Sequence, residues 1–326
     1  MGKTIKREDS KHRSKIGGQA LIEGVMMKGA YTGAMACRLP DGTIDVETWP
    51  EKNGKDMPWY RKCPLVRGSF NFVLSMKDGY RCLMKSAEKQ VVEGEEEDET
   101  EEMGKFEQWL NDKLGDKIFG IIMSIAMVIG IAFAVFAFVF LPKWIIGFLI
   151  SHTPINDDSR FIRSLLEGII KIAIFLVYMI ITGCMKDIRR TYEYHGAEHK
   201  TIACFEAGDP LTVENVKKHT RFHPRCGTSF IFITLIVSIL VMCLVPLTIV
   251  WQRAIVSILL LPLVVGISYE FIRIAGKSNN IITRILSWPG LQIQRITTRE
   301  PDASQIECAI EALKPCIPEN LEDDEW

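Results

Sequence analysis

Long apolar runs divide the chain into membrane-like and polar segments. The runs 118–141 and 228–250 contain no charged residue, and each is longer than the ~20 residues that a helix needs to cross a hydrocarbon core. Two further runs, 161–185 and 254–272, carry only a few charges. Because a bilayer offers no water to backbone N–H and C=O groups, such runs form helices. The pattern therefore predicts four transmembrane helices within a membrane domain at 118–272.

Lysine and arginine are unevenly distributed among the segments that join these runs. The connector 186–227 holds eight of them, whereas the other two joining segments offer only Lys143, Arg160 and Arg253. Cytoplasmic loops carry the excess of basic residues in membrane proteins. We therefore predict a multi-pass protein of the cell membrane, with the lipid bilayer as a partner and with the connector and both termini in the cytoplasm.

The run 161–185 contains Arg163, Glu167 and Lys171, spaced four residues apart on one helix face. An ion-paired stripe turned toward the helix bundle is one interpretation of this spacing. A polar pathway is the other, because ionisable groups inside a span are costly and are often functional. The stripe is favoured, since the three residues lie near one end of the run.

The N-terminal residues 1–92 are predicted to form a cytoplasmic module. A Pro-Asp-Gly turn between two short strand-like runs predicts a β-hairpin at 34–49. The helical spacing of apolar residues at 65–85 predicts a basic amphipathic helix, which lies either on the inner leaflet or over the module. Eight of the ten residues 93–102 are acidic, so 93–117 is predicted to be a solvated linker ahead of the membrane.

The C-terminal segment 273–326 is also predicted to be cytoplasmic. Residues 291–298 alternate like a strand, which could pair with the N-terminal hairpin, and Pro301 precedes a predicted helix at 302–313. The predicted fold class is a membrane all-α core of four transmembrane helices. A small α+β cytoplasmic module is added to it by the N-terminal, connector and C-terminal segments.

The connector carries the strongest chemical pattern in the sequence. His195 and His199 are four residues apart, so on a helix both imidazoles point to one side and can share a metal ion. With Glu198 they give the order H-x-x-E-H, the reversed zincin pattern, in which two histidines bind zinc and the glutamate is the general base. In that interpretation Glu198 removes a proton from a water molecule activated by the metal.

The end of the same connector offers further ligands. Four of the six histidines lie between His195 and His223, and Cys226 follows three residues later. His223 and Cys226 could complete a tetrahedral zinc site with the first pair. Three protein ligands would leave a catalytic position open, whereas four would close a structural site, and the sequence leaves both open. Cys226, placed ahead of a helix, is also a candidate nucleophile with a histidine base.

Three carboxylates are candidates for supporting roles. Glu193 and Glu206 are alternative oxygen ligands or partners of the ligands. Glu23, in a glycine-rich block at 17–29, could approach the connector as a ligand or base. Pairing with an arginine or lysine at a packing seam is the favoured alternative.

Composition excludes some classes of protein. The net charge of −1 is uninformative about a nucleic-acid partner, which would need a concentrated basic face, and no such partner is predicted. The nine cysteines show no disulfide-scaffold spacing, and reduced thiols facing the cytosol are expected.

Four blocks of sequence resemble a known family. They are GGQALIEGVMMK at 17–28, YHGAEHKTI at 194–202, HPRCGTSF at 223–230 and TTREPD at 297–302. Together they resemble the YqhQ-like bacterial multi-pass membrane family, a domain of unknown function that has been described as predicted metal-dependent enzymes. The resemblance covers nearly the whole chain and implies a bacterial multi-pass membrane protein.

Two functions follow as expectations. The first is a metal-dependent hydrolase, with zinc held by His195, His199 and His223 and with Cys226 close by, that acts on a membrane-associated substrate at the inner membrane surface. The second is a non-catalytic membrane scaffold or transport accessory with a structural metal site or none. Protein partners and an oligomeric state are left open by the sequence.

Overall fold

The computed structural model describes residues 12–54, 57–90, 117–152, 160–247, 249–277 and 281–324. The chain divides into two compact units: the first comprises Met1–Val91, Leu176–Met242 and Val256–Trp326, and the second comprises Val92–Phe175 and Cys243–Ile255. Residues 93–116 of the predicted acidic linker lie outside the described residues. The domain boundaries predicted from sequence stay a prediction.

The first unit contains a four-stranded antiparallel sheet. Its strands follow chain order: β1 (Gly17–Leu21), β2 (Gly24–Lys28), β3 (Thr32–Arg38) and β4 (Ile44–Pro50). The pairing of β3 with β4 confirms the predicted hairpin, whose turn contains Gly42 at φ 87°. The strands β1 and β2 were not predicted, because they lie in the glycine-rich block at 17–29, to which no secondary structure was assigned.

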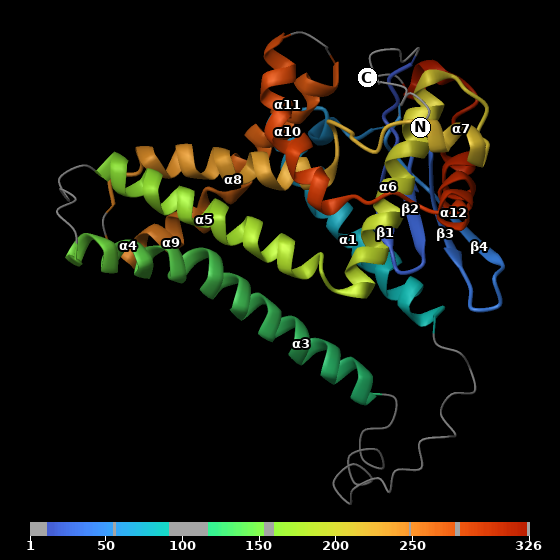
Figure 1. Cartoon of the computed structure of the whole chain (residues 1–326). Coiled ribbons are helices and arrows are strands. Elements are labelled where there is room, and N and C mark those ends of the chain that lie inside the picture. The colour runs from blue at the N-terminus through green and yellow to red at the C-terminus, as the bar shows by residue number, and fades with distance from the viewer. Residues whose placement is uncertain are drawn as a thin grey trace, which may run out of the picture. The chain divides into compact units, whose positions relative to one another are not determined.

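Helices cover both faces of this sheet, as Figure 1 shows. α6 (Lys186–Ala207) and α12 (Ala303–Leu313) pack on one face, where Val25 and Met27 of β2 are fully buried. On the other face, Met26 packs in a cluster with Cys82 of α1 (Val66–Glu88). Side chains alternate between the faces of a strand, so a strand buried on both sides is apolar throughout. This explains the run Val-Met-Met in β2.

The predicted amphipathic helix is α1, and it packs on α10 (Leu261–Lys277). A Cβ on Gly68 would lie 2.9 Å from the Cα of Gly266, so a glycine permits this close approach. Arg67 forms an ion pair with Glu270 of α10. The helix therefore covers the module, as one of the two predictions stated, and its outward face carries exposed apolar side chains, which are Phe70, Val73, Met76 and Tyr80.

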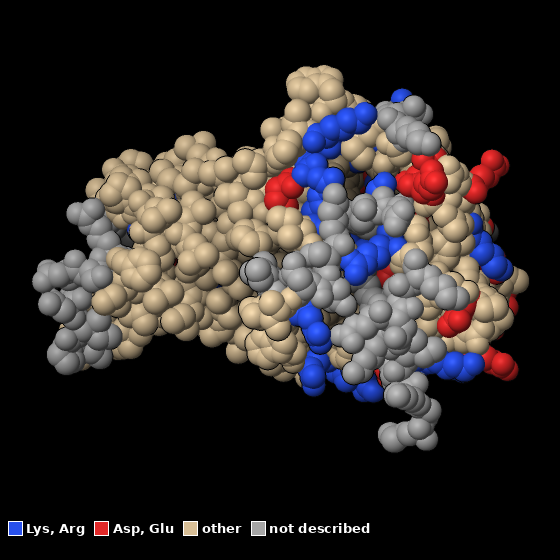
Figure 2. All heavy atoms as spheres, turned by 90° about the horizontal axis from the view of Figure 1, so that it is seen from above, with Lys and Arg blue, Asp and Glu red and all other residues tan. Residues whose placement is uncertain are grey.

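Three helical stretches in the described part of the chain are long and apolar enough to cross a membrane: Ile125–His152, Phe161–Thr182 and Gly227–Leu244. The first stretch comprises most of α3 (Lys117–Val135), the π-helical segment Phe136–Phe140 and α4 (Leu141–His152). The second lies in α5 (Arg160–Thr182), and the third is α8 (Gly227–Leu244). A fourth candidate is the pair α9 (Val250–Leu259) and α10, which is bent by 50°. The described chain is thus mostly helical, with three or four candidate spans. On the face seen in Figure 2, most charged side chains lie on the first unit, which contains the sheet.

Two predictions about the C-terminal half have different outcomes. The predicted strand at 291–298 was wrong, since these residues lie almost entirely in α11 (Ile281–Thr297). Gly290, Ile293, Gln294 and Thr297 are buried there at helical spacing, so the apparent alternation was one side of a longer helical pattern. The predicted helix at 302–313 is confirmed as α12, with Asp302 as its N-cap.

Candidate metal centre

The first unit brings the two ends of the connector together. The ligand atoms of His195, His199 and Cys226 all lie within 4.8 Å of one another, and these three residues form the His/Cys group. His195 and His199 lie on α6, whose helical spacing aligns their rings at a centroid distance of 4.4 Å. Cys226 directly precedes α8. This juxtaposition could hold a metal ion.

Backbone carbonyls orient both imidazoles. His195 Nδ1 lies 2.9 Å from the Thr297 carbonyl oxygen, and His199 Nδ1 lies 2.6 Å from that of Arg221. Because a carbonyl oxygen can only accept a hydrogen bond, Nδ1 carries the proton in each ring, and Nε2 of the neutral ring is free to bind a metal. Metal-ligating histidines usually have this arrangement.

The inward-facing atoms fit this interpretation. His195 Nε2 lies 3.1 Å from Cys226 Sγ. His199 Nε2 is buried and has no hydrogen-bond partner among the described residues. A buried polar atom without a partner costs free energy unless something binds it. Among the described residues, His199 Nε2 is thus an acceptor that a cation shared with the neighbouring ring and thiolate could occupy.

Electrostatics favour the thiolate form of Cys226. Burial alone would raise the pKa of this thiol, but the nearby His195 and His199 imidazoles lower it well below its usual value. Burial likewise opposes protonation of His195, and the Cys226 sulfur overcomes this effect and raises the pKa of His195 to about 9. The Thr228 N–H also donates to the sulfur at 3.4 Å. A thiolate is the form of cysteine that binds metals.

Glu198 lies on the same stretch of α6 and is almost fully buried, with 4% of its surface exposed. Burial raises the pKa of its carboxyl, although His199 and His195 oppose that effect. One oxygen, Oε2, has no hydrogen-bond partner in the described part of the chain. Gly18 of β1 packs against this side chain, because a Cβ there would lie 3.0 Å from Glu198 Cδ.

The other predicted ligand, His223, lies beside the group but outside it. Its ring centroid is 5.5 Å from that of His199, and its Nε2 lies 3.9 Å from Glu206 Oε2 and 3.4 Å from Arg225 Nη2. The backbone of His223 is fixed by Gln294, which donates to its carbonyl at 2.6 Å and accepts from its N–H at 2.8 Å.

The remaining polar candidates have partners of their own. Glu206 is fully buried against Arg225, and Glu193 accepts a hydrogen bond from Gln305 at 3.1 Å. Glu23 pairs with Arg190, whose Nη2 lies 2.6 Å away, and accepts from Tyr194 at 3.1 Å. Glu23 therefore lies at a packing seam, as sequence analysis favoured. His219, also in the connector, pairs with Asp209 at 3.0 Å.

Sequence reasoning missed the residues that hold the ligands in place. Gly18, Gln294, Thr297 and the Arg221 carbonyl come from different segments. A backbone carbonyl leaves no signal in a sequence. Thr297, however, lies in the block TTREPD, which was noted without an assigned role.

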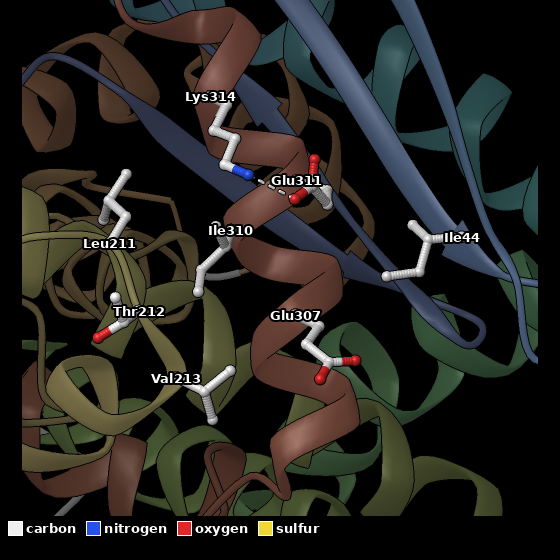
Figure 3. Close-up of a pocket in the computed structure, with 8 residues that line it drawn as sticks. All are labelled: Ile44, Leu211, Thr212, Val213, Glu307, Ile310, Glu311 and Lys314. Atoms are coloured by element: carbon white, nitrogen blue, oxygen red, sulfur yellow. Dashed lines mark hydrogen bonds and ion pairs between the residues drawn. The ribbon is translucent and has the colours of Figure 1, made fainter.

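A surface hollow elsewhere in the first unit, about 370 Å³ in volume, does not include the His/Cys group. Eight residues line it: Ile44, Leu211, Thr212, Val213, Glu307, Ile310, Glu311 and Lys314. Figure 3 shows that they come from α12 and the residue after it, from the start of α7 (Val213–Lys218) with the two residues before it, and from strand β4. Lys314 pairs with Glu311 there at 2.6 Å. This hollow carries no constellation of catalytic or metal-binding side chains.

These features define the class: a multi-pass membrane protein in which two histidines and a cysteine form a group that could hold a metal. The chain belongs to the family described as "Protein of unknown function (DUF1385)", whose model matches residues 63–319. It is 34% identical over 311 residues to "Uncharacterized protein YqhQ" of Bacillus subtilis (strain 168), a match that covers 94% of each chain. The resemblance noted from the sequence is thus confirmed. No solved structure matches the chain.

Proposed function

We propose that this protein binds zinc through His195, His199 and Cys226 at the cytoplasmic surface of the membrane, and that it is a metal-dependent hydrolase. The observation that carries the proposal is the convergence of three ligand atoms within 4.8 Å in a buried place, with each imidazole oriented by a backbone carbonyl. Imidazole and thiolate together favour zinc over the oxygen-loving cations.

The ligand count supports a site with an open position. His223 is turned toward Glu206 and Arg225, so the group supplies three protein ligands, the number typical of catalytic zinc sites. Zinc bound there supplies a Lewis acid that activates a water molecule at neutral pH. Glu198, with an unpartnered carboxylate oxygen beside both histidines, is the residue placed to take and return a proton.

The rival function is a non-catalytic scaffold with a closed structural site. Burial favours it, because Cys226 and His199 are 6% and 1% exposed and the described hollow lies elsewhere. A rotation of His223 toward its neighbour His199 would supply the fourth ligand. The two functions therefore differ in two respects: the scaffold needs His223 for metal binding, and the hydrolase needs Glu198 for turnover.

Metal analysis of the purified full chain tests the binding step. The protein is prepared in detergent without chelators, and zinc per chain is measured by elemental analysis. We expect about one zinc per chain from a single three-ligand site, loss of it in His195→Ala and Cys226→Ser, and retention in Glu198→Gln. His219→Gln is the matched control, since His219 is in the same connector and its side chain pairs with Asp209, outside the His/Cys group. Metal-free protein, or equal loss in the control, would overturn the site.

Cobalt substitution and turnover separate the two functions. An open three-ligand site gives a cobalt spectrum that changes when azide is added, whereas a closed four-ligand site does not respond. For turnover, the probes are p-nitrophenyl acetate, bis-p-nitrophenyl phosphate and a fluorogenic peptide library. Loss of the general base in Glu198→Gln is expected to slow hydrolysis by roughly 100-fold or more with the metal retained. An azide-insensitive spectrum with loss of metal in His223→Ala supports the scaffold.

The predicted orientation is part of the proposal. It is supported by the eight basic residues of the connector, since cytoplasmic loops carry such an excess. A green fluorescent protein fused to the C-terminus becomes fluorescent only in the cytoplasm, and an alkaline phosphatase fusion is active only outside it. We expect the green fluorescent protein fusion to be fluorescent and the alkaline phosphatase fusion to be inactive. The reverse pattern contradicts the orientation.

A further inference from the structure

Four charged side chains converge inside the second unit. They come from three helices: Lys143 from α4, Glu167 and Lys171 from α5, and Arg253 from α9. Glu167 lies 3.1 Å from Lys171, 3.6 Å from Arg253 and 4.0 Å from Lys143. The exposed fractions of the side chains are 7% for Glu167, 8% for Lys143, 10% for Arg253 and 18% for Lys171. This is the cation cluster.

The sequence-based placement of two residues of the cation cluster was wrong. Lys143 and Arg253 were assigned to the segments that join the spans, but Lys143 lies in the candidate span Ile125–His152 and Arg253 lies in the broken pair α9 and α10. The interpretation of Glu167 and Lys171 as an ion pair turned toward the bundle agrees with their 3.1 Å contact. Lys143 and Arg253 add two positive charges to this pair.

Three cations face a single carboxylate. Only Lys171 approaches Glu167 within hydrogen-bonding distance, while Arg253 donates to two neutral groups, the Ser164 hydroxyl and the Leu247 carbonyl, both at 3.0 Å. Among the described residues, no second carboxylate pairs with these cations. Excess charge within a span is costly, so such groups pair with one another or with a bound counter-ion. The cluster therefore has the charge of a site for an anion.

We infer that the cation cluster binds the phosphate group of an anionic membrane lipid. Arginine and lysine are the residues that bind phosphate, and an excess of cations within a membrane span requires a counter-ion. The source is assigned to a lipid because apolar side chains of the same helices are exposed around the cluster. Trp144, next to Lys143, is 71% exposed and Phe148 is 57% exposed, which suits contact with acyl chains and the membrane interface.

Native mass spectrometry of the full-length protein tests this inference. The probes are phosphatidylglycerol and phosphatidylcholine, each titrated in the same detergent, and the measured quantity is the apparent Kd of the first bound lipid. We expect phosphatidylglycerol to bind more tightly. Removal of one charged hydrogen-bond donor in Lys143→Met or Arg253→Met should weaken this lipid roughly tenfold or more. Lys186→Met, which removes an exposed cation from α6, should leave the Kd unchanged.

Glu167→Gln gives the opposite sign and separates a binding site from a packing contact. It removes the one carboxylate, so the phosphatidylglycerol affinity should rise while the thermal stability falls. If Glu167→Gln and Lys143→Met both lower stability and neither changes lipid affinity, the cluster is only structural and the inference is wrong. Stabilisation by inorganic phosphate without lipid, lost in Lys143→Met, would overturn the lipid assignment. None of these measurements depends on zinc, so the outcome is independent of the proposed function.

Discussion

Substitution of Gly196 by alanine is a sharp test of how the His/Cys group is held. Gly196 lies in α6 next to His195, and a Cβ there would lie 1.9 Å from the Arg299 carbonyl oxygen. An ordinary C···O contact is roughly 3.3 Å or more, so the two backbones must separate by more than about 1 Å. The segment that has to move also contains Thr297, whose carbonyl orients His195.

Two opposing effects set the magnitude. Alanine in a helix interior is favoured over glycine by roughly 1 kcal/mol. Overpacking in a tight core costs about 1–3 kcal/mol, and a backbone oxygen yields less easily than the end of a flexible side chain. Arg299 is further tied to α6 by its N–H bond to the Tyr192 carbonyl at 2.8 Å. We therefore expect a net loss of about 1–2 kcal/mol in the free energy of unfolding.

Zinc affinity should fall as well, by roughly 10- to 100-fold, which is the usual effect of disturbing the partner of a ligating histidine. The assay is competition with a chelator of known zinc affinity, paired with the thermal unfolding midpoint in detergent. Gly17→Ala is the matched control, since no atom lies within 4 Å of a Cβ at that strand position. If Gly196→Ala binds zinc and unfolds like the wild type while its fold is intact, the proposed anchoring of His195 is refuted.

Three further predictions concern residues outside the ligands. Burial raises the pKa of both Cys37 and Cys204 to about 12, so at pH 7.5 almost no thiolate forms. Neither cysteine should therefore react with iodoacetamide in the folded protein. Peptide mapping checks this, with the exposed Cys184 as the comparison. Glu23→Gln leaves Arg190 without its carboxylate, and we expect a loss of roughly 0.5–1 kcal/mol in the free energy of unfolding in urea, with no change in zinc content, because the Arg190 side chain is 45% exposed. Asp302→Ala removes the side-chain acceptor of a capping box, which receives the Gln305 N–H, and should cost about 0.5–2 kcal/mol. Although burial opposes it, hydrogen bonds from Ser304 and Gln305 lower the pKa of Asp302, so its contribution is present above about pH 4 and is lost as the pH falls, and a wild-type–mutant difference that grows in acid would contradict this.

The first pair of ligands could be predicted because helical spacing alone brings two imidazoles together. His195 and His199 lie on a helix, as their spacing indicated. The approach of Cys226 needed a fold-back between α6 and α8, which the proline at position 224, two residues before Cys226, permits but does not specify. The direction of the His223 ring could not be predicted, because it depends on Glu206 and Arg225, whose places are set by tertiary packing.

The fold shows the same division between local and non-local information. The hairpin of β3 and β4, the helix α12 and the apolar spans follow from turn residues, capping and hydropathy, which act over a few residues. The strand β2 is buried on both faces, so it lacks the alternation by which strands are recognised, and β1 begins with two glycines, which strands rarely contain. The cations Lys143 and Arg253 were wrongly placed in the joining segments, because a charged residue ends an apolar run in a hydropathy pattern. Both lie beside Glu167 of another helix, and a sequence does not show such a contact.

The four blocks that carry the family resemblance meet at one place in the fold. The block at 17–28 contributes Gly18 against Glu198, and the block at 194–202 supplies both histidines. The block at 223–230 supplies Cys226, and the block at 297–302 supplies the Thr297 carbonyl. Two of these blocks supply the three ligand atoms, a third orients the His195 ring, and the first packs against the glutamate that lies between the two histidines. Since function resides in sites rather than in folds, the His/Cys group is where the chemistry of this family should be sought.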